Sequence, residues 1–231
     1  DFGNLTRSYI NQIEEANSIE INYSTNVENL QQDNEGDWYL SLEGGVENNR
    51  IVRSKFVFLG AGGGALTLLQ KSRIPEGLSY AGFPVSGKWL ICEEEKLTKT
   101  HNAKVYGNAA VGAPPMSVPH LDTRWIDGER SLLFGPFAGF SSNFLKYGSK
   151  LDLFRSIKTT NFFSMLQAGL DNIDLGKYLL NQLIQTNEDR MKTLKRFLPK
   201  ASSNDWKLSI AGQRVQIIKQ TSKGGVLKMG T

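Results

Sequence analysis

A glycine-rich bend is the feature that most constrains the fold of this chain. The run from Lys55 to Leu66 begins with apolar residues, places four glycines among the five residues from Gly60 to Gly64, and resumes as a helical pattern. Because glycine has no side chain, the backbone of such a bend can contact a bulky ligand, and the N-terminus of the following helix can face its phosphates. The pattern predicts a buried strand, a bend and a helix. A tight strand-to-helix turn without a ligand explains it equally well, because the spacing differs from the G-x-G-x-x-G dinucleotide fingerprint.

The composition is typical of a globular protein. Its 231 residues, 39% of them apolar, can form one large domain or two small ones, and no apolar run approaches the roughly 20 residues of a membrane span. The single cysteine, Cys92, excludes an internal disulfide framework and a cysteine-based metal site, and it fits a reducing compartment. Two histidines argue against a histidine-rich site, so we expect no metal. The chain starts at Asp1 without Met, which indicates a processed chain or an excised piece.

Charge is distributed unevenly along the chain. Residues 1–140 carry 12 Lys/Arg against 17 Asp/Glu, whereas residues 141–231 carry 15 against 6. A basic half can meet nucleic acid, anionic lipid or an anionic substrate, or it can form an ordinary solvated surface. No recognition motif favours nucleic acid, so we expect no nucleic-acid partner.

Periodicity predicts an α+β fold. Residues at helical spacing (Leu5, Tyr9, Ile13, Ala16) indicate an N-terminal helix with Asn4 as its N-cap. Further helices are expected over 173–184 and from Asn187 to Pro199. The expected strands and extended segments are 19–23, 26–30, 38–42, 51–59, 103–111, 131–134, 206–210 and 214–218.

A proline-rich segment carries the first candidate for chemistry. Three prolines between Pro114 and Pro119 predict a stiff, extended loop over 112–124, which ends with His120 and Arg124. A histidine near neutral pKa can accept a proton from a hydroxyl, and an arginine can hold a carboxylate through two hydrogen bonds. The alternative is a histidine bonded to a loop carbonyl and an arginine paired with Asp122.

Other polar residues form a second candidate group. His101, Lys104 and Tyr106 lie at the head of an expected strand, and His101 is the rival base. Arg214 is expected at the start of another apolar strand, where it either meets water or faces an anion in a cleft.

The stretch from Lys146 to Phe163 mixes basic and aromatic residues. Such a stretch can lie in a membrane interface, or it can be an ordinary amphipathic segment packed against a core.

Several long segments closely resemble the malate:quinone oxidoreductase family of FAD-dependent enzymes. They occur in family order and extend over most of the chain, which makes the resemblance more specific than any single motif. Family members are longer, and the parts that carry the Rossmann fingerprint and complete the flavin site look absent. The matching segments are FVFLGAGGGALTLLQKSRIPE at 56–76, GFPVSGKWL at 82–90, HNAKVYGNAAVGAPPMSVPHLDTR at 101–124, LLFGPFAGFSSNFLKYGS at 132–149 and AGQRVQIIK at 211–219.

The resemblance implies a partial FAD-dependent oxidoreductase fold. Residues 1–80 would belong to the FAD-binding domain, 81–200 to a sheet-based substrate domain with a helical segment, and 201–231 to strands returning toward the flavin. It also implies oxidation of (S)-malate to oxaloacetate, with electrons passed through FAD to a membrane quinone in the tricarboxylic acid cycle. The enzyme would be cytoplasmic and peripheral on the inner face of the cell membrane, and this piece would be inactive alone.

Roles for individual residues follow from the same resemblance. His120 is the expected base and His101 the runner-up, with substrate held by Arg124 and Arg214 beside Lys104 and Tyr106. Backbone contacts to FAD are expected from Val27, Gly60, Ala61, Gly62 and Gly63. A flavin enzyme for another hydroxy acid, such as 2-hydroxyglutarate, and a non-catalytic basic binding module are the competing hypotheses.

Overall fold

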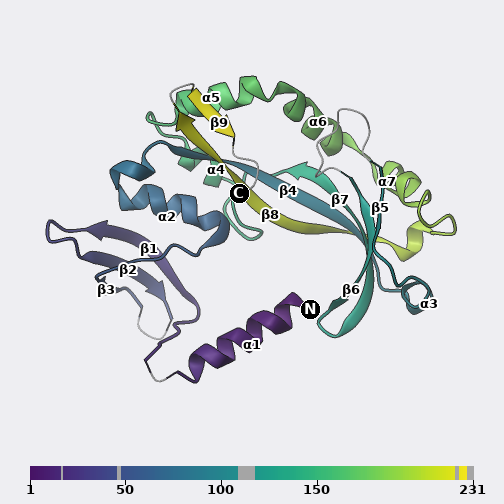
Figure 1. Cartoon of the computed structure of the whole chain (residues 1–231), viewed down its shortest axis with the longest axis horizontal. Coiled ribbons are helices and arrows are strands. Elements are labelled where there is room, and N and C mark those ends of the chain that lie inside the picture. The colour runs from purple at the N-terminus through teal and green to yellow at the C-terminus, as the bar shows by residue number, and fades with distance from the viewer. Residues whose placement is uncertain (17, 46–47, 109–117, 222–223, 228–231) are drawn as a thin grey trace. The chain divides into compact units, whose positions relative to one another are not determined.

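The computed structural model describes residues 1–16, 18–45, 48–108, 118–221 and 224–227 (Figure 1). It has mixed helices and antiparallel sheets, which confirms the α+β prediction. The chain forms two compact units, each built from separate stretches. Unit 1 comprises Asp1–Ala16, Val85–Phe140 and Ile173–Gly212, and unit 2 comprises Asn17–Pro84, Ser141–Asn172 and Gln213–Thr231. Strands β4 (Tyr80–Cys92) and β8 (Lys207–Thr221) contribute residues to both.

Unit 2 begins with a three-stranded antiparallel meander. Its strands, in order, are β1 (Thr25–Gln32), β2 (Trp38–Gly44) and β3 (Arg50–Ser54). A turn at 33–37 joins β1 to β2 as expected, and Gly36 adopts the positive φ of +89° that favours glycine there. The segment 19–23, expected to be extended, lies outside any strand.

The expected strand 51–59 is wrong beyond Ser54. From Lys55 to Ala61 the chain belongs to no strand, and Phe56 and Phe58 are 76% and 85% exposed. A short 3-10 turn, η1 (Gly62–Gly64), then leads into α2 (Ala65–Ser72) and a second turn, η2 (Pro75–Gly77). The helix after the glycines is therefore confirmed, whereas the buried strand before them is not. An apolar run favours burial, but a strand also needs a partner. No described segment of this unit pairs with the chain from Lys55 to Ala61.

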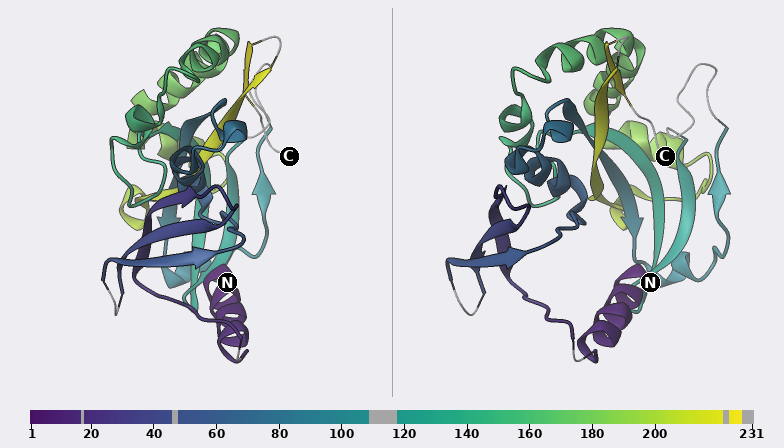
Figure 2. Two further views of the ribbon diagram at one scale, coloured as in Figure 1. Left: turned by 90° about the vertical axis from the view of Figure 1, so that its left-hand side faces the viewer. Right: turned by 60° about the vertical axis from the view of Figure 1, so that its left-hand side comes forward.

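The remainder of unit 2 packs helices against strand ends. Helices α4 (Asp152–Ser156) and α5 (Phe162–Asp171) accompany the unit's parts of β4 and β8, together with β9 (Gly224–Leu227). A small core of Ala81, Ala168 and Ile218 joins α5 to these strands. Figure 2 shows the backbone of these elements from two further sides.

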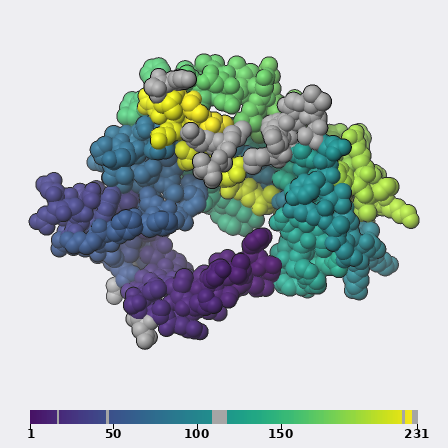
Figure 3. Space-filling model, viewed as in Figure 1, coloured from purple at the N-terminus to yellow at the C-terminus, as the bar shows by residue number. Residues whose placement is uncertain are grey.

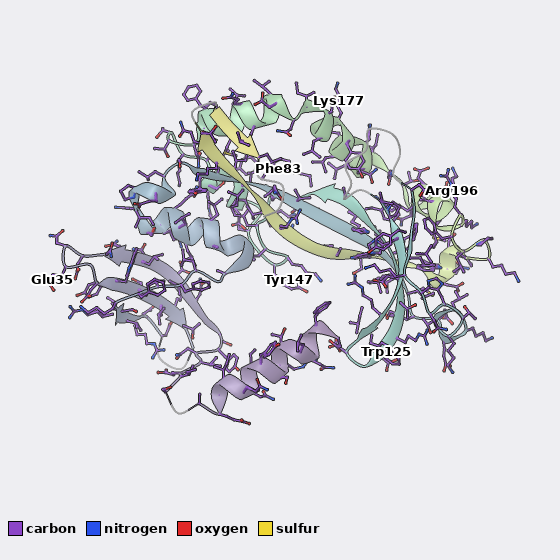
Figure 4. The ribbon with its side chains drawn as sticks, viewed as in Figure 1. Glu35, Phe83, Trp125, Tyr147, Lys177 and Arg196 are labelled. Carbon is purple, nitrogen blue, oxygen red and sulfur yellow. The ribbon has the colours of Figure 1, made fainter. Side chains whose placement is uncertain are left out.

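Unit 1 contains a sheet in which β5 (Val105–Tyr106), β6 (His120–Ile126), β7 (Glu129–Phe140), β4 and β8 are neighbours in that order. Strands β6 and β7 form a tight hairpin whose turn residues, Asp127 and Gly128, both have positive φ. Trp125 lies near the tip of this hairpin (Figure 4).

Helices cover one face of that sheet. The core joins Leu121, Phe134 and Leu90 of the sheet to Met191 and Leu194 of α7 (Asn187–Leu194), as the sequence pattern predicts. The other helical elements are α1 (Phe2–Glu14), α3 (Glu95–Thr98), α6 (Ile173–Ile184) and η4 (Ser203–Asp205). No helix in the described ranges has both the length and the apolar character needed to cross a membrane.

Two predicted helix caps are wrong by one position or one turn. Asp1, not Asn4, accepts the first N–H groups of α1, and Thr186, not Asn187, caps α7 in a reciprocal pair with Asp189. Ser, Thr, Asp and Asn all make good caps, so their type alone does not select among neighbours.

Candidate functional site

The exposed face of the unit 1 sheet gathers the predicted polar residues. Side chains alternate along a strand, so Leu121 enters the core while His120, Asp122 and Arg124 share the opposite face of β6. The expectation that His120 and Arg124 lie on a loop is therefore wrong. The apolar and β-branched alternation of 120–126 overrides the preceding prolines, and residues 109–117 of that segment lie outside the described part.

His120 lies in an aromatic setting. Its ring centroid is 4.9 Å from that of Tyr106, its partner across β5–β6, and 5.2 Å from Trp89 in an edge-on arrangement. Its Nε2 is buried without a hydrogen-bond partner in the described residues. Burial, and then the charge of Lys104, lower the pKa of His120 below its usual 6.5, although Asp122 and a hydrogen bond with the Val118 backbone oppose them. The imidazole is therefore neutral at pH 7 and can accept a proton.

Two cations meet the carboxylate of Asp122, which is 8% exposed. Arg124 Nε donates to Asp122 Oδ2 at 2.9 Å, and Lys104 Nζ lies 3.6 Å from the same oxygen. Both cations also contact rings, with Arg124 over Trp89 at 5.5 Å and Lys104 over Tyr106 at 5.2 Å. A hydrogen bond with Tyr106 raises the pKa of Lys104, so its charge is retained.

These contacts match part of the alternative reading of the sequence. Arg124 is paired with Asp122, and His120 bonds to a neighbouring backbone group. However, Arg124 uses its Nε for that pair, and His120 keeps a buried nitrogen unpartnered by any described residue. An unpaired buried polar atom costs free energy, so it is itself a sign of a ligand or water at that nitrogen.

His101 is anchored through its backbone. Its carbonyl accepts hydrogen bonds from Thr123 Oγ1 at 2.7 Å and from Arg130 at 2.8 Å. Its Nε2 is also buried and unpartnered among the described residues, but no described ring or ion-pair contact joins it to His120.

The remaining predicted residues belong to unit 2. Arg214 is exposed within the continuous strand β8, so its expected place at the head of a separate strand is wrong. Val27 is half-buried beside a bulge in β1.

The glycine bend combines a packing constraint with exposed backbone. A Cβ on Gly63 would lie 2.1 Å from the Phe144 carbonyl oxygen, so close chain packing explains this glycine without a ligand. Gly60, Ala61 and Gly62 are exposed, and a Cβ on Gly62 would meet no atom within 4 Å. Among the described residues, no side chain forms a capping hydrogen bond with the following helix α2. The bend thus has room beside Gly62 for an anionic group such as a phosphate, although the N–H groups of Gly64 and Ala65 already donate to the carbonyls of Ala61 and Gly62.

Sequence reasoning missed Trp89 and the whole of β4 around it. Glycines and a proline within Tyr80–Cys92 suppress a strand signal, although Ile91, Leu90 and Trp89 themselves favour one. Sequence reasoning also gave no role to a surface hollow lined by Ile91, Glu93, Glu94, Asn204, Asp205 and Lys207, which contains none of the predicted site residues. A triad of Asp33, Glu35 and Asp37 brings carboxylate oxygens within 4.8 Å, but Arg53 and Lys55 already pair with Asp37.

Comparison with known proteins decides the family. The sequence profile described as malate:quinone oxidoreductase (Mqo) matches residues 1–231. The chain belongs to the malate:quinone oxidoreductase family. It is 90% identical over 231 residues to a probable malate:quinone oxidoreductase of Prochlorococcus marinus strain NATL1A and 63% identical to one of strain MIT 9211. A third relative, from Synechococcus sp. strain CC9902, is 58% identical over 236 residues.

These matches cover all of this chain and 46–47% of each relative. The chain therefore spans about half the length of the curated malate:quinone oxidoreductases it matches, and the resemblance seen in the sequence is confirmed.

Proposed function

We propose that the full-length protein oxidises (S)-malate to oxaloacetate and passes the electrons through FAD to a membrane quinone, a reaction of the tricarboxylic acid cycle. Family membership over the whole chain supports this function. The observation that carries it is the buried Nε2 of His120, which has no hydrogen-bond partner among the described residues, beside the cations Arg124 and Lys104.

His120 acts as the general base. Loss of hydride from C2 of malate leaves positive character on that carbon unless the hydroxyl proton departs as well. His120 Nε2 accepts this proton, because burial and neighbouring cations keep the imidazole unprotonated. His101 remains the second candidate for this role.

Arg124 binds one carboxylate of malate, and the second carboxylate is assigned to Arg214 from the family resemblance alone. A guanidinium held by its Nε still offers donors for a planar carboxylate, and Asp122 fixes Arg124 in this way. Lys104 and Tyr106 add polar groups beside His120 and Arg124, and the charge of Lys104 keeps the electrostatic potential there positive. The rings of Trp89 and Tyr106 contact the imidazole and limit the positions it can take.

The fold and the cofactor follow the family. Residues 1–80 form part of the FAD domain, 81–200 the substrate domain and 201–231 the strands that return toward the flavin. The exposed backbone of Gly60, Ala61 and Gly62, together with the half-buried Gly63 and Val27, would hold the FAD nucleotide, since the bend has room for an anionic group. When bound, FAD supplies the acceptor for the hydride.

The protein works at the cytoplasmic side of the cell membrane as a peripheral enzyme. A membrane quinone requires an approach to the bilayer, and the basic character of residues 141–231 favours anionic lipid.

Reduction of a water-soluble dye by the full-length protein tests this function. We expect malate to support reduction and 2-hydroxyglutarate to support it poorly. A preference for 2-hydroxyglutarate, or the absence of any flavin, would overturn the proposal.

A further inference from the structure

Helix α5 of unit 2 has its large apolar side chains on the outside. At helical spacing, Phe162, Phe163, Leu166 and Leu170 fall on one stripe, and all four are exposed, with Phe163 at 77%. We call these four residues the α5 outer surface. A helix that packs on a protein core normally presents the opposite arrangement.

Small residues form the inner side of the same helix. Ser164 and Ala168 are buried, and a Cβ on Gly225 of β9 would lie 1.8 Å from the Ser164 carbonyl oxygen. Asn161 then anchors the start of the helix, because its side-chain amide donates to the carbonyls of Tyr80 at 3.1 Å and Ser156 at 2.9 Å. The side of the helix that carries small residues therefore packs on the protein, and the large apolar side chains point outward.

The chain just before α5 also exposes large apolar side chains, and basic residues lie among them. Phe154 and Ile157 are exposed, and Arg155 and Lys158 lie between and beside them. The Lys158 carbonyl accepts the Phe162 N–H at 2.9 Å, so this cation lies one turn from the first aromatic residue of the stripe. From Phe154 to Leu170 the sequence contains no Asp or Glu.

The surrounding segment is also cationic. Lys146, Lys150, Arg155 and Lys158 are all exposed, whereas the one acidic residue between 145 and 170, Asp152, accepts the backbone N–H of Phe144 at 3.1 Å. Helix α5 lies in the green band along the top of Figure 3, and Figure 4 labels Tyr147 of the preceding segment, which is nearly fully exposed.

We infer that the α5 outer surface, with Arg155 and Lys158 at its N-terminal end, inserts into the headgroup region of an anionic lipid bilayer. Exposed Phe and Leu beside Lys and Arg is the pattern of an interfacial helix, and the one acidic residue of α5, Asp171, lies at its C-terminal end, away from Arg155 and Lys158. A protein partner of ordinary composition would leave these cations without matching charge, whereas anionic headgroups supply it. The inference rests on the proposed function only because an enzyme that reduces a membrane quinone must approach the bilayer.

Vesicle sedimentation of the full-length enzyme tests the inference. We expect binding to vesicles of phosphatidylcholine with phosphatidylglycerol, and the variant Phe163→Ser/Leu166→Ser/Leu170→Ser should lower the partition coefficient about tenfold or more. Arg155→Gln/Lys158→Gln should lower it about fivefold per charge on anionic vesicles and little on pure phosphatidylcholine. Ile51→Ser in β3, also at an exposed apolar position, is the matched control and should bind like the wild type. Wild-type binding by the triple variant would overturn the inference.

A fluorescent label distinguishes lipid from another part of the polypeptide. Phe163→Cys carrying an environment-sensitive dye should shift to the blue when anionic vesicles are added, and Ile51→Cys should not. A label already in apolar surroundings before vesicles are added would show that protein covers this face, and would overturn the inference even if the triple variant fails to fold. Malate-dependent dye reduction is measured in parallel, because its absence would contradict the proposed function while leaving the vesicle result decisive.

Discussion

Arg124 Nε donates to Asp122 Oδ2 at 2.9 Å, and the two residues occupy alternate positions on one face of β6. Because the bond uses only Nε, it orients the guanidinium without occupying all its donors. A carboxylate that looks like a simple neutralising partner therefore also sets the orientation of the Arg124 guanidinium.

Replacing Arg124 by Met should raise the KM for malate about 10- to 100-fold, because a charged hydrogen-bonded pair contributes about 1.5–3 kcal/mol. The turnover number should change less. Arg214→Met should act in the same direction if it holds the second carboxylate. Steady-state kinetics of the full-length enzyme provide the measurement, with Lys207→Met, an exposed cation paired with Glu93, as control. An unchanged malate dependence in either arginine variant would remove that residue from the site.

Removal of the Lys104 charge and removal of the Asp122 charge should shift the acid limb of the pH profile of kcat/KM in opposite directions. Burial and Lys104 lower the pKa of His120, whereas Asp122 raises it. Since the base must be unprotonated, kcat/KM should fall as pH drops through a pKa below 6.5. Lys104→Met should move this limb to higher pH and Asp122→Asn to lower pH. Shifts of equal sign, or none, would show that another group controls the limb.

The predictability of the fold differs between elements for physical reasons. Helices α1, α6 and α7 and strands β1 and β2 followed from their periodicity, because each has a simple amphipathic or alternating pattern. Strand β4 did not, since Gly82, Pro84 and Gly87 weaken the strand signal of its sequence, while a Cβ on Gly82 would lie only 2.3 Å from Val215. Close packing against neighbouring atoms requires small residues in this strand, and the local conformational preference of those residues favours turns.

The site could be predicted in part. Residue chemistry singled out His120, Arg124, Lys104 and Tyr106, and the register of β5 and β6 brings them to one face. Residue chemistry could not identify Trp89, because this residue contacts His120 and Arg124 from a strand that the sequence did not predict. The roles of these residues remain predictions.

Two glycines of the bend should respond differently to Ala. Gly63→Ala should destabilise the protein by about 1–3 kcal/mol, because its Cβ would lie 2.1 Å from the Phe144 carbonyl oxygen. Gly60→Ala should leave stability nearly unchanged, since its Cβ would be 3.5 Å from the Phe58 ring, but should reduce bound FAD. Thermal unfolding and the flavin absorbance of the purified protein separate the two effects. Full FAD content in Gly60→Ala would count against the proposed nucleotide contact.

Asp37 should govern acid stability of the β1–β3 meander. Hydrogen bonds from Lys55, and then Arg53, lower the pKa of this carboxyl below its ordinary 3.8. A carboxyl whose pKa is lower in the folded than in the unfolded state stabilises the fold above pH 3.8. This stabilisation is lost as the pH falls through the folded-state pKa. Asp37→Asn should therefore lower the Tm at pH 7 and weaken the pH dependence in acid. Glu35→Gln, whose carboxylate lies 3.8 Å from Arg53 and is largely exposed, is the control. An equal Tm loss in both variants would contradict this account.

The central claim is that His120 takes the hydroxyl proton of malate. The most direct measurement is the single-turnover rate of flavin reduction by saturating malate in full-length His120→Ala, compared with His101→Ala. We predict a loss of about 100-fold or more for His120→Ala, with FAD content retained, and a much smaller loss for His101→Ala. A near-native rate in His120→Ala would contradict the account, and a large loss confined to His101→Ala would transfer the role to His101.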